Sequence, residues 1–354
     1  MKQKLLVFPA YSLLLISLFF SNTARADSPP TSLTDYPVYV VKIPNLNDYS
    51  LFANGGWDGN WYVGSNTCWI KRLPPIPPGD YSHAYLGVKL GRAKLLVNSK
   101  NIWDKQPIPG TIYMAIASTP AWTRDQSFFV TDTESIPLEG DSDSAVDGTG
   151  EAQWFWAEVP LRHVDFKGDN YLALWSATPE LLSVSSSPVL AAAWGGKDQD
   201  TWLTREVHGA PPHDPRQSIG TPISYFQPAL ALKLIPKGAS HSVNVQLLNW
   251  KAGTPDHPKP VVTANVVGDS IERVWLEYFI EKSGEPNPRG IPSMNHTWAR
   301  VGRPLWKAPY ILSIEQTRLP AGRVQLRVAA SNIWEQRGYS NAFTVEVATS
   351  TSKK

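Results

Sequence analysis

Aromatic and polar side chains that could bind a sugar are concentrated in one short segment of the chain. It reads Trp57-Asp58-Gly59-Asn60-Trp61. A flat indole ring can stack on the apolar face of a sugar, while carboxylate and amide groups hydrogen-bond its hydroxyls. Glycine beside Asp and Asn favours a turn, where side chains are exposed. Trp57, Asp58, Asn60 and Trp61 are therefore our first candidate ligand-binding residues.

A second aromatic pair, Trp154 and Trp156, flanks Phe155. Alternate side chains of a strand share a face, so both indoles should lie on one side and Phe155 on the other. We add Trp154 and Trp156 to the ligand-binding candidates. The alternative for each tryptophan is core filling, because a packed aromatic side chain buries about 150–250 Å². The segment before residue 237 holds ten of the 15 tryptophans, namely Trp57, Trp61, Trp69, Trp103, Trp122, Trp154, Trp156, Trp175, Trp194 and Trp202.

Acidic side chains and glycines cluster in the segment LEGDSDSAVDGTGEAQ, residues 138–153. Calcium takes about six to eight oxygen ligands, which flexible Asp- and Gly-rich loops supply. The candidate ligands are Asp141, Asp143, Asp147 and Glu151, and calcium is the one cofactor that the sequence suggests. The spacing lacks the glycine and the terminal glutamate of the helix–loop–helix calcium motif. The alternative is an acidic surface loop without a bound ion.

Common catalytic motifs do not occur: there is no HExxH, GxSxG, Walker phosphate loop or GxGxxG after a strand. We therefore name no catalytic residue. Two carboxylates among Asp58, Asp80, Glu151 and Glu158 would suit glycan hydrolysis if they lay about 5–10 Å apart. The single cysteine, Cys68, has apolar neighbours, which favours a buried thiol over a nucleophile.

Short strands are the elements that must position these residues. Apolar residues alternate with others at Leu86, Val88 and Leu90, and again at Ile112, Met114 and Ile116. This period of two predicts strands, and Gly/Pro-rich turns separate them. We expect an all-β fold, in which a jelly-roll-like sandwich over 27–236 precedes an immunoglobulin-like sandwich. The remaining boundaries are a linker at 237–242, the second sandwich at 243–348 and a polar tail at 349–354.

The N-terminal 26 residues are typical of a signal peptide. Lys2 and Lys4 precede an apolar stretch, and Ala24-Arg25-Ala26 supplies a cleavage site. We expect a secreted, periplasmic or cell-surface protein with no membrane span after cleavage. Removing three basic residues from 33 leaves 30, against 31 acidic residues. A net charge of −1 gives no electrostatic reason to expect nucleic acid as a partner.

The two halves differ in charge. Residues 27–236 hold 15 basic and 22 acidic residues, whereas residues 237–354 hold 15 basic and 9 acidic residues. Opposite signs could favour docking of the domains, and the alternative is chance variation of surface charge. In the second half, Trp275 and Phe279 share a strand face with Arg273 and Glu277. We expect that face to be a contact surface, either for the first domain or for a partner.

The C-terminal half resembles the bacterial immunoglobulin-like domains of secreted enzymes and surface proteins. The resemblance lies in IERVWLEYFIE and in APYILSIEQTRLPAGRVQLRVAASNIWEQRGYSNAFTVEV. The positions that match are Pro309-Tyr310, Ala321-Gly322, Ala329 and Ser340. The sequence departs from the family at Trp334-Glu335-Gln336, where a small turn is usual. Over roughly 260–348 the resemblance implies a sandwich that serves as a spacer or binding module and has no catalytic residues.

Together these features favour an exported, non-catalytic binding protein. Its tryptophan-rich first domain would recognise a polysaccharide or a cell-surface protein, and its immunoglobulin-like domain would act as a spacer. Two alternatives remain open at this point. One is a structural or assembly protein of the cell envelope that works through protein–protein contacts. The other is a glycan-active hydrolase that uses paired carboxylates.

Overall fold

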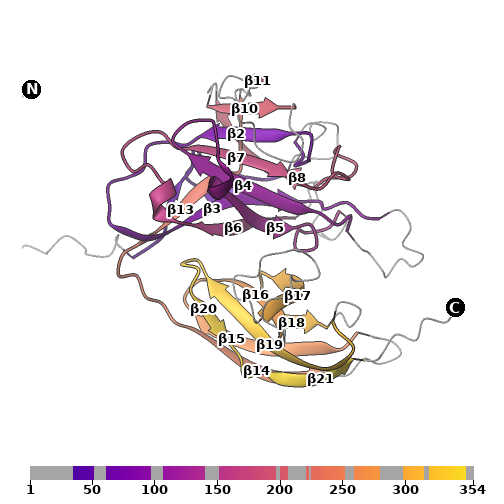
Figure 1. The fold of residues 1–354 in the computed structure, drawn as a ribbon. Helices are drawn as coiled ribbons and strands as arrows, with labels where there is room; N and C mark the ends of the chain where they lie inside the picture. Colours follow the sequence, from indigo (N-terminus) through magenta and orange to yellow (C-terminus); the bar gives the residue numbers. More distant parts are fainter. Residues whose placement is uncertain are drawn as a thin grey trace, which may run out of the picture. The chain divides into compact units, whose positions relative to one another are not determined.

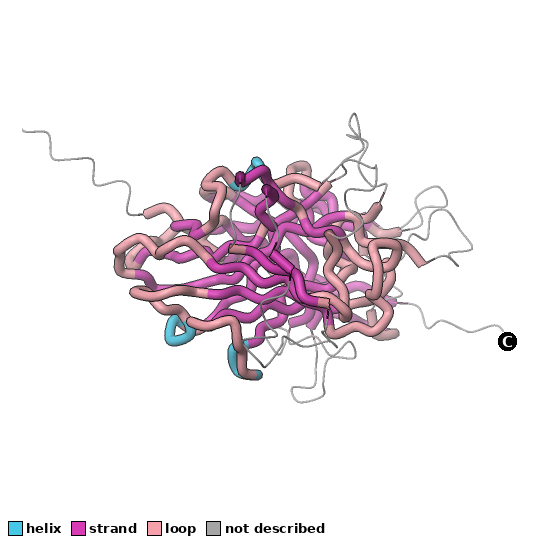
Figure 2. The backbone as a smooth tube through the Cα atoms, turned by 90° about the horizontal axis from the view of Figure 1, so that it is seen from above, coloured by secondary structure: helices cyan, strands magenta, loops and turns pink. Residues whose placement is uncertain are grey.

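The fold is built from antiparallel strands, as the alternating sequence pattern predicts. The computed structural model describes residues 35–51, 61–96, 107–139, 151–196, 200–205, 221–222, 225–251, 259–279, 298–314 and 319–347. The helical segments within these ranges are short 3-10 turns, η2 (Leu46–Asp48), η4 (Arg124–Gln126) and η5 (Leu161–His163), drawn in cyan in Figure 2. The expected all-β fold is thus confirmed. Within the same ranges, no helix is long and apolar enough to cross a membrane. The expected signal peptide, residues 1–26, lies outside the described residues.

The first group of strands, which we call the first sandwich, runs from β1 to β13 (Figure 1). One sheet has the order β1-β13-β3-β6 with β8 on β3, a second has the order β11-β10-β2-β7-β4-β5, and β9 pairs with β12. The bounds are β1 (Val38–Val40), β2 (Cys68–Arg72), β3 (Tyr81–Gly91), β4 (Thr111–Ala117), β5 (Ser127–Asp132), β6 (Ala152–Val159), β7 (Tyr171–Ser176), β8 (Val189–Leu190), β9 (Ala192–Gly196), β10 (Thr201–Thr204), β11 (Thr221–Pro222), β12 (Tyr225–Pro228) and β13 (Leu230–Pro236).

The second group, the second sandwich, runs from β14 to β21. Its sheets have the orders β14-β15-β18 and β17-β16-β19-β20, with β21 on β19. The bounds are β14 (Val243–Lys251), β15 (Val261–Gly268), β16 (Ile271–Phe279), β17 (Trp298–Leu305), β18 (Tyr310–Ser313), β19 (Gly322–Asn332), β20 (Arg337–Tyr339) and β21 (Phe343–Val347). Both sandwiches belong to one compact unit that begins at Asp35. The jelly-roll and immunoglobulin-like assignments and the exact domain limits stay predictions.

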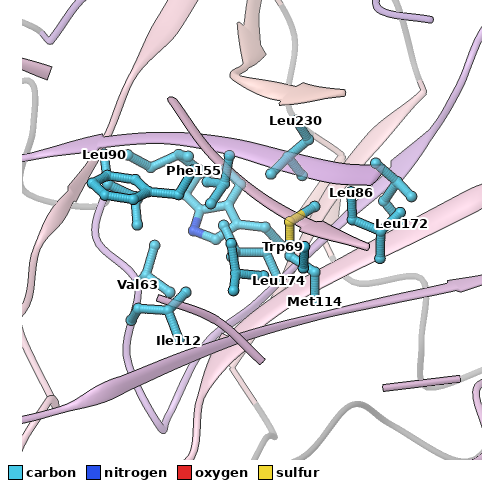
Figure 3. Close-up of a cluster of buried hydrophobic side chains, with 14 of the residues drawn as sticks. Val63, Trp69, Leu86, Leu90, Ile112, Met114, Phe155, Leu172, Leu174 and Leu230 are labelled. Carbon is cyan, nitrogen blue, oxygen red and sulfur yellow. The ribbon is translucent and has the colours of Figure 1, made fainter. Parts of the chain in front are cut away.

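The core of the first sandwich lies between its two larger sheets. The alternating residues Leu86 and Leu90 of β3 and Ile112 and Met114 of β4 are all fully buried in it (Figure 3). At its centre is the fully buried Trp69, whose Nε1 donates a hydrogen bond to the carbonyl of Tyr62 at 2.9 Å. The apolar area removed from water stabilises the fold by about 25 cal/mol per Å². The polar atom of the buried indole is satisfied, so its burial costs little.

The six-stranded sheet is also buried on its other face. Cys68 and Ile70 of β2 lie there beside Ala173 of β7, and Trp122 packs against them with its Nε1 hydrogen-bonded to the carbonyl of Tyr171. Burial raises the pKa of the Cys68 thiol to about 12, because the apolar surroundings disfavour the thiolate. The buried, unreactive thiol expected from the neighbouring residues fits this environment.

Cys68 should therefore report on unfolding. At pH 8 a thiol with a pKa near 12 is ionised in about one molecule in ten thousand, and burial excludes the reagent as well. We expect Ellman's reagent to leave the native protein unmodified over an hour and to titrate one thiol per chain once urea unfolds it. Rapid release of one equivalent of chromophore from the native protein would contradict the placement of Cys68.

Candidate functional site

Of the first four ligand-binding candidates, the structure describes Trp61 alone. Trp57, Asp58 and Asn60 lie outside the described residues. Trp61 is 8% exposed and packs on Trp69, with ring centroids 4.7 Å apart. The structure thus places Trp61 in the core, in agreement with the core-filling alternative.

Trp154 and Trp156 share one face of β6, and Phe155 points into the main core, as the alternation predicts. The two indoles are stacked with centroids 5.2 Å apart. Trp156 is 4% exposed, and its Nε1 donates to Glu272 of the second sandwich at 3.0 Å. Trp154 is half-buried and meets Tyr49 edge to face. Trp156 is therefore enclosed by protein, and the pair lies beside a contact between the sandwiches.

The structure describes one of the four candidate calcium ligands, Glu151. Asp141, Asp143 and Asp147 lie outside them. Glu151 is exposed, and its carboxylate accepts a hydrogen bond from Gln153. Within the described ranges no group of three or more His, Cys, Asp or Glu side chains could hold a metal ion. The calcium site stays a prediction.

The candidate catalytic carboxylates that the structure describes are far apart. Glu151 directly precedes β6 and Glu158 lies near its end, so seven residues of extended chain separate them, a span of about 23 Å. Glu158 is directly opposite Tyr85 of β3. Asp80 precedes β3 and is five residues from Tyr85, so it lies about 16 Å along the strand from the position opposite Glu158. Asp80 is exposed and faces Lys237 at 3.3 Å. Asp58 lies outside the described residues. Both estimated spans exceed the separation of about 5–10 Å that glycan hydrolysis needs.

The most exposed tryptophan of the described part of the first sandwich is Trp194, on β9. Its side chain is 66% exposed, and that of Tyr225 on β12 is 40% exposed. The two rings are stacked with centroids 5.6 Å apart and planes 25° apart. Phe226 supports Trp194 edge to face at 5.3 Å. We call Trp194 and Tyr225 the aromatic platform.

A β-bulge builds the aromatic platform. Trp194 is directly opposite Phe226 in the β9–β12 ladder, and the register shifts between Phe226 and Tyr225. Consecutive residues of a regular strand point to opposite faces, so the bulge is what lets both Tyr225 and Phe226 contact one indole. Tyr225 has φ 72°, which is a strained conformation for a bulky residue. Strain of this kind is often retained at functional sites.

Buried polar groups anchor β12 behind the aromatic platform. Gln227 is fully buried and accepts a hydrogen bond from Lys71 of β2, which is also fully buried. The Lys71 ammonium donates to Asp200 at 2.9 Å and to Thr201 at 3.3 Å. A buried charge is tolerated when it is paired and hydrogen-bonded in this way. Lys71 thereby ties β12 to β2 and to β10.

Apolar contacts continue from the aromatic platform to the core. Phe226 meets Trp61 edge to face at 6.3 Å, and Trp61 packs on Trp69. The exposed rings are thus supported from below by packed aromatic side chains. The platform residues are held in place by the fold before any ligand arrives.

Sequence reasoning did not select Trp194. The available signal is its position at the end of a buried alanine run and before Gly195-Gly196. Gly195 is needed for a close approach, because a Cβ there would lie 2.1 Å from Cγ of Gln227. An aromatic residue beside such a pair of glycines sits where a strand ends and side chains become exposed.

Comparison with known proteins identifies no family. No family model and no curated protein matches the sequence. Three of the similar solved structures carry the names of a glycoside hydrolase domain, a glucuronidase and a glucanase. The endo-D glycoside hydrolase domain from Streptococcus pneumoniae R6 is 12% identical, with 83% of this chain and 33% of that chain covered and a TM-score of 0.21. A β-glucuronidase from Ruminococcus gnavus is 9% identical, with 85% and 39% covered and a TM-score of 0.20. A β-1,2-glucanase from Parabacteroides distasonis is 11% identical, with 80% and 31% covered and a TM-score of 0.22.

These neighbours correct the expected function. We expected a non-catalytic binding protein, whereas the similar structures are a glycoside hydrolase domain, a glucuronidase and a glucanase. We therefore do not retain the non-catalytic interpretation. The chain spans between 31% and 39% of the length of these proteins. With TM-scores near 0.2, the likeness transfers no activity to this chain.

The contact behind the aromatic platform predicts the effect of a small substitution. In Gly195→Ala the added methyl group collides with the buried Gln227 side chain, which Lys71 holds in place. We expect the free energy of unfolding to fall by about 1–3 kcal/mol. The melting temperature should fall by roughly 2–10 °C. An unchanged or higher melting temperature would show that the strand has room for a side chain, because alanine at an unstrained site stabilises a fold.

Proposed function

We propose that the chain is an exported glycan-active protein that contacts carbohydrate through the aromatic platform of Trp194 and Tyr225. The observation that carries this proposal is a stacked Trp–Tyr pair that remains 66% and 40% exposed in a protein whose other described tryptophans before residue 237 are buried or half-buried. Export is inferred from the signal-like residues 1–26. The second sandwich is proposed to be immunoglobulin-like, on the sequence resemblance stated above.

The chemistry of the aromatic platform suits a sugar. A pyranose has an apolar face of C–H groups, and an exposed indole offers a flat apolar surface that gains from leaving water. Tyr225 and Phe226 already hold the Trp194 ring, so little side-chain freedom is lost on binding. The proposal concerns contact with carbohydrate and assigns no catalytic residue.

Substitution of Trp194 tests the proposal. The purified protein is run in native gels that contain members of a panel of soluble polysaccharides, and any that retards it is measured by isothermal titration. We expect Trp194→Ala to weaken binding at least tenfold, which corresponds to about 1.4 kcal/mol. Trp indoles at binding sites commonly contribute this much or more.

Trp250→Ala is the matched control. Trp250 lies on β14 of the second sandwich and is 43% exposed, so the substitution removes an exposed indole of the same kind away from β9 and β12. We expect this variant to bind as the unchanged protein does. Equal binding by Trp194→Ala and the unchanged protein, or the absence of any polysaccharide ligand, would overturn the proposal.

A further inference from the structure

The three residues at which the sequence departs from the immunoglobulin-like family contact the first sandwich, the linker and the first described residues. Trp334, Glu335 and Gln336 lie in the turn between β19 and β20. Glu335 has φ 61°, a left-handed conformation that is uncommon for a residue other than glycine. Each of the three side chains contacts a segment outside its own sheet. We call this turn the clamp loop.

Glu335 binds a buried lysine of the first sandwich. Its carboxylate accepts a hydrogen bond from Nζ of Lys233 on β13 at 2.7 Å, and the lysine side chain is fully buried. Arg273 of β16 binds the other oxygen of the same carboxylate. An ion pair removed from water needs such complete pairing, since loss of one partner leaves an uncompensated buried charge.

Glu272 and Trp156 complete this charged cluster. Glu272 lies 3.5 Å from Nζ of Lys233 and accepts a hydrogen bond from Nε1 of Trp156 at 3.0 Å. The Lys233 ammonium also lies 4.3 Å from the centre of the Trp156 ring, which is within cation–π range. Gly87 leaves room for that ring, because a Cβ at residue 87 would lie 2.0 Å from it. The first sandwich therefore presents an ammonium group beside an indole N–H, and both can bind a carboxylate.

The other two side chains of the clamp loop hold the linker and the first described residues. Trp334 is 3% exposed, donates to the carbonyl of Asp35, and stacks on His241 with centroids 3.6 Å apart. The Gln336 amide accepts a hydrogen bond from the backbone N–H of His241 and donates to the carbonyl of Ala239 at 3.1 Å. The backbone of the 237–242 linker is thus bonded to the second sandwich.

A second contact lies on the face that carries Trp275. Arg300 of β17 pairs with Asp132 of β5 at 3.1 Å. Trp306, just after β17, packs edge to face on Phe155 of the first core. Two contacts at separate places restrict rotation of one sandwich on the other far more than a single one.

We propose that the clamp loop docks the second sandwich on the first and holds the two in one orientation, so that the second sandwich is not a freely jointed spacer. The surface on which the clamp loop docks is formed by Lys233 and Trp156 in the same chain. Burial alone would raise the pKa of Glu335, but Arg273 and Lys233 outweigh it and hold the pKa at about 2. The carboxylate is therefore charged at neutral pH. The inference does not depend on what the aromatic platform binds.

Limited trypsin digestion tests the docking. Lys237 is in the linker, and its side chain is 70% exposed, so it is open to the protease whenever the linker backbone is released. In the docked state its backbone N–H is bonded to the carbonyl of Asp80 at 2.8 Å. We expect the unchanged protein to resist cleavage after Lys237 under native conditions. The fragment that ends at Lys237 is identified by mass.

Glu335→Gln should make the peptide bond after Lys237 more accessible to trypsin. The substitution keeps the size of the side chain but removes the charge that neutralises Lys233 and Arg273. We expect cleavage after Lys237 to become at least tenfold faster, because the rate follows the population of the undocked state. The matched control is Glu346→Gln, which removes an exposed carboxylate from β21 of the same sandwich and should leave the rate unchanged.

Gln336→Ala keeps the test decisive if Glu335→Gln does not fold. It leaves every charge in place and removes only the bonds to Ala239 and His241. We expect it to speed cleavage at least threefold with the circular dichroism spectrum unchanged. Cleavage of folded Gln336→Ala at the unchanged protein's rate would overturn the inference, as would a folded Glu335→Gln that behaves like Glu346→Gln.

Discussion

The ammonium group of Lys233 lies where water does not reach, and the junction between the sandwiches is arranged around it. It is neutralised by Glu335 and approached by Glu272, both from the second sandwich, and it lies over the Trp156 ring. Separating the sandwiches would remove both carboxylates from this ammonium, so the pairing opposes separation. The clamp loop supplies Glu335 and also binds the linker, and Gly87 leaves room for the Trp156 ring beside the ammonium. The orientation of the second sandwich therefore depends on the pairing of Lys233 with Glu335.

The aromatic platform also depends on a buried lysine with its polar partners. Lys71 of β2 is a second fully buried lysine, and its bonds to Asp200 and Gln227 fix β12 against β2 within the first sandwich. With β12 fixed, a bulge places both Tyr225 and Phe226 against Trp194. In both places a buried lysine holds an aromatic residue in one position. A protein with a single cysteine cannot use an internal disulfide for this purpose, and buried ion pairs supply the rigidity.

The sequence predicted the all-β fold because alternation with a period of two depends on local side-chain order alone. The shared face of Trp154 and Trp156 followed from the same rule. The exposure of Trp194 did not, because it depends on a bulge and on strands that are distant in the sequence. Trp61 lies in the core although glycine and polar residues precede it, because Trp69 and Phe226 surround it. Net charge was a poor guide to docking. The first half is acidic and the second basic, yet the buried ion pair between the sandwiches joins Lys233 of the first half to Glu335 of the second.

The central claim is that the two sandwiches move as one body, and amide relaxation measured by transverse-relaxation-optimised NMR tests it most directly. The full chain is isotopically labelled, and a rotational correlation time is derived separately from the strand amides of β2 to β7 and of β15 to β21. The pairing of Lys233 with Glu335 predicts the same correlation time for both sets at neutral pH, as for one rigid particle. A clearly shorter time for the second set would show that this sandwich reorients independently, and it would contradict the account.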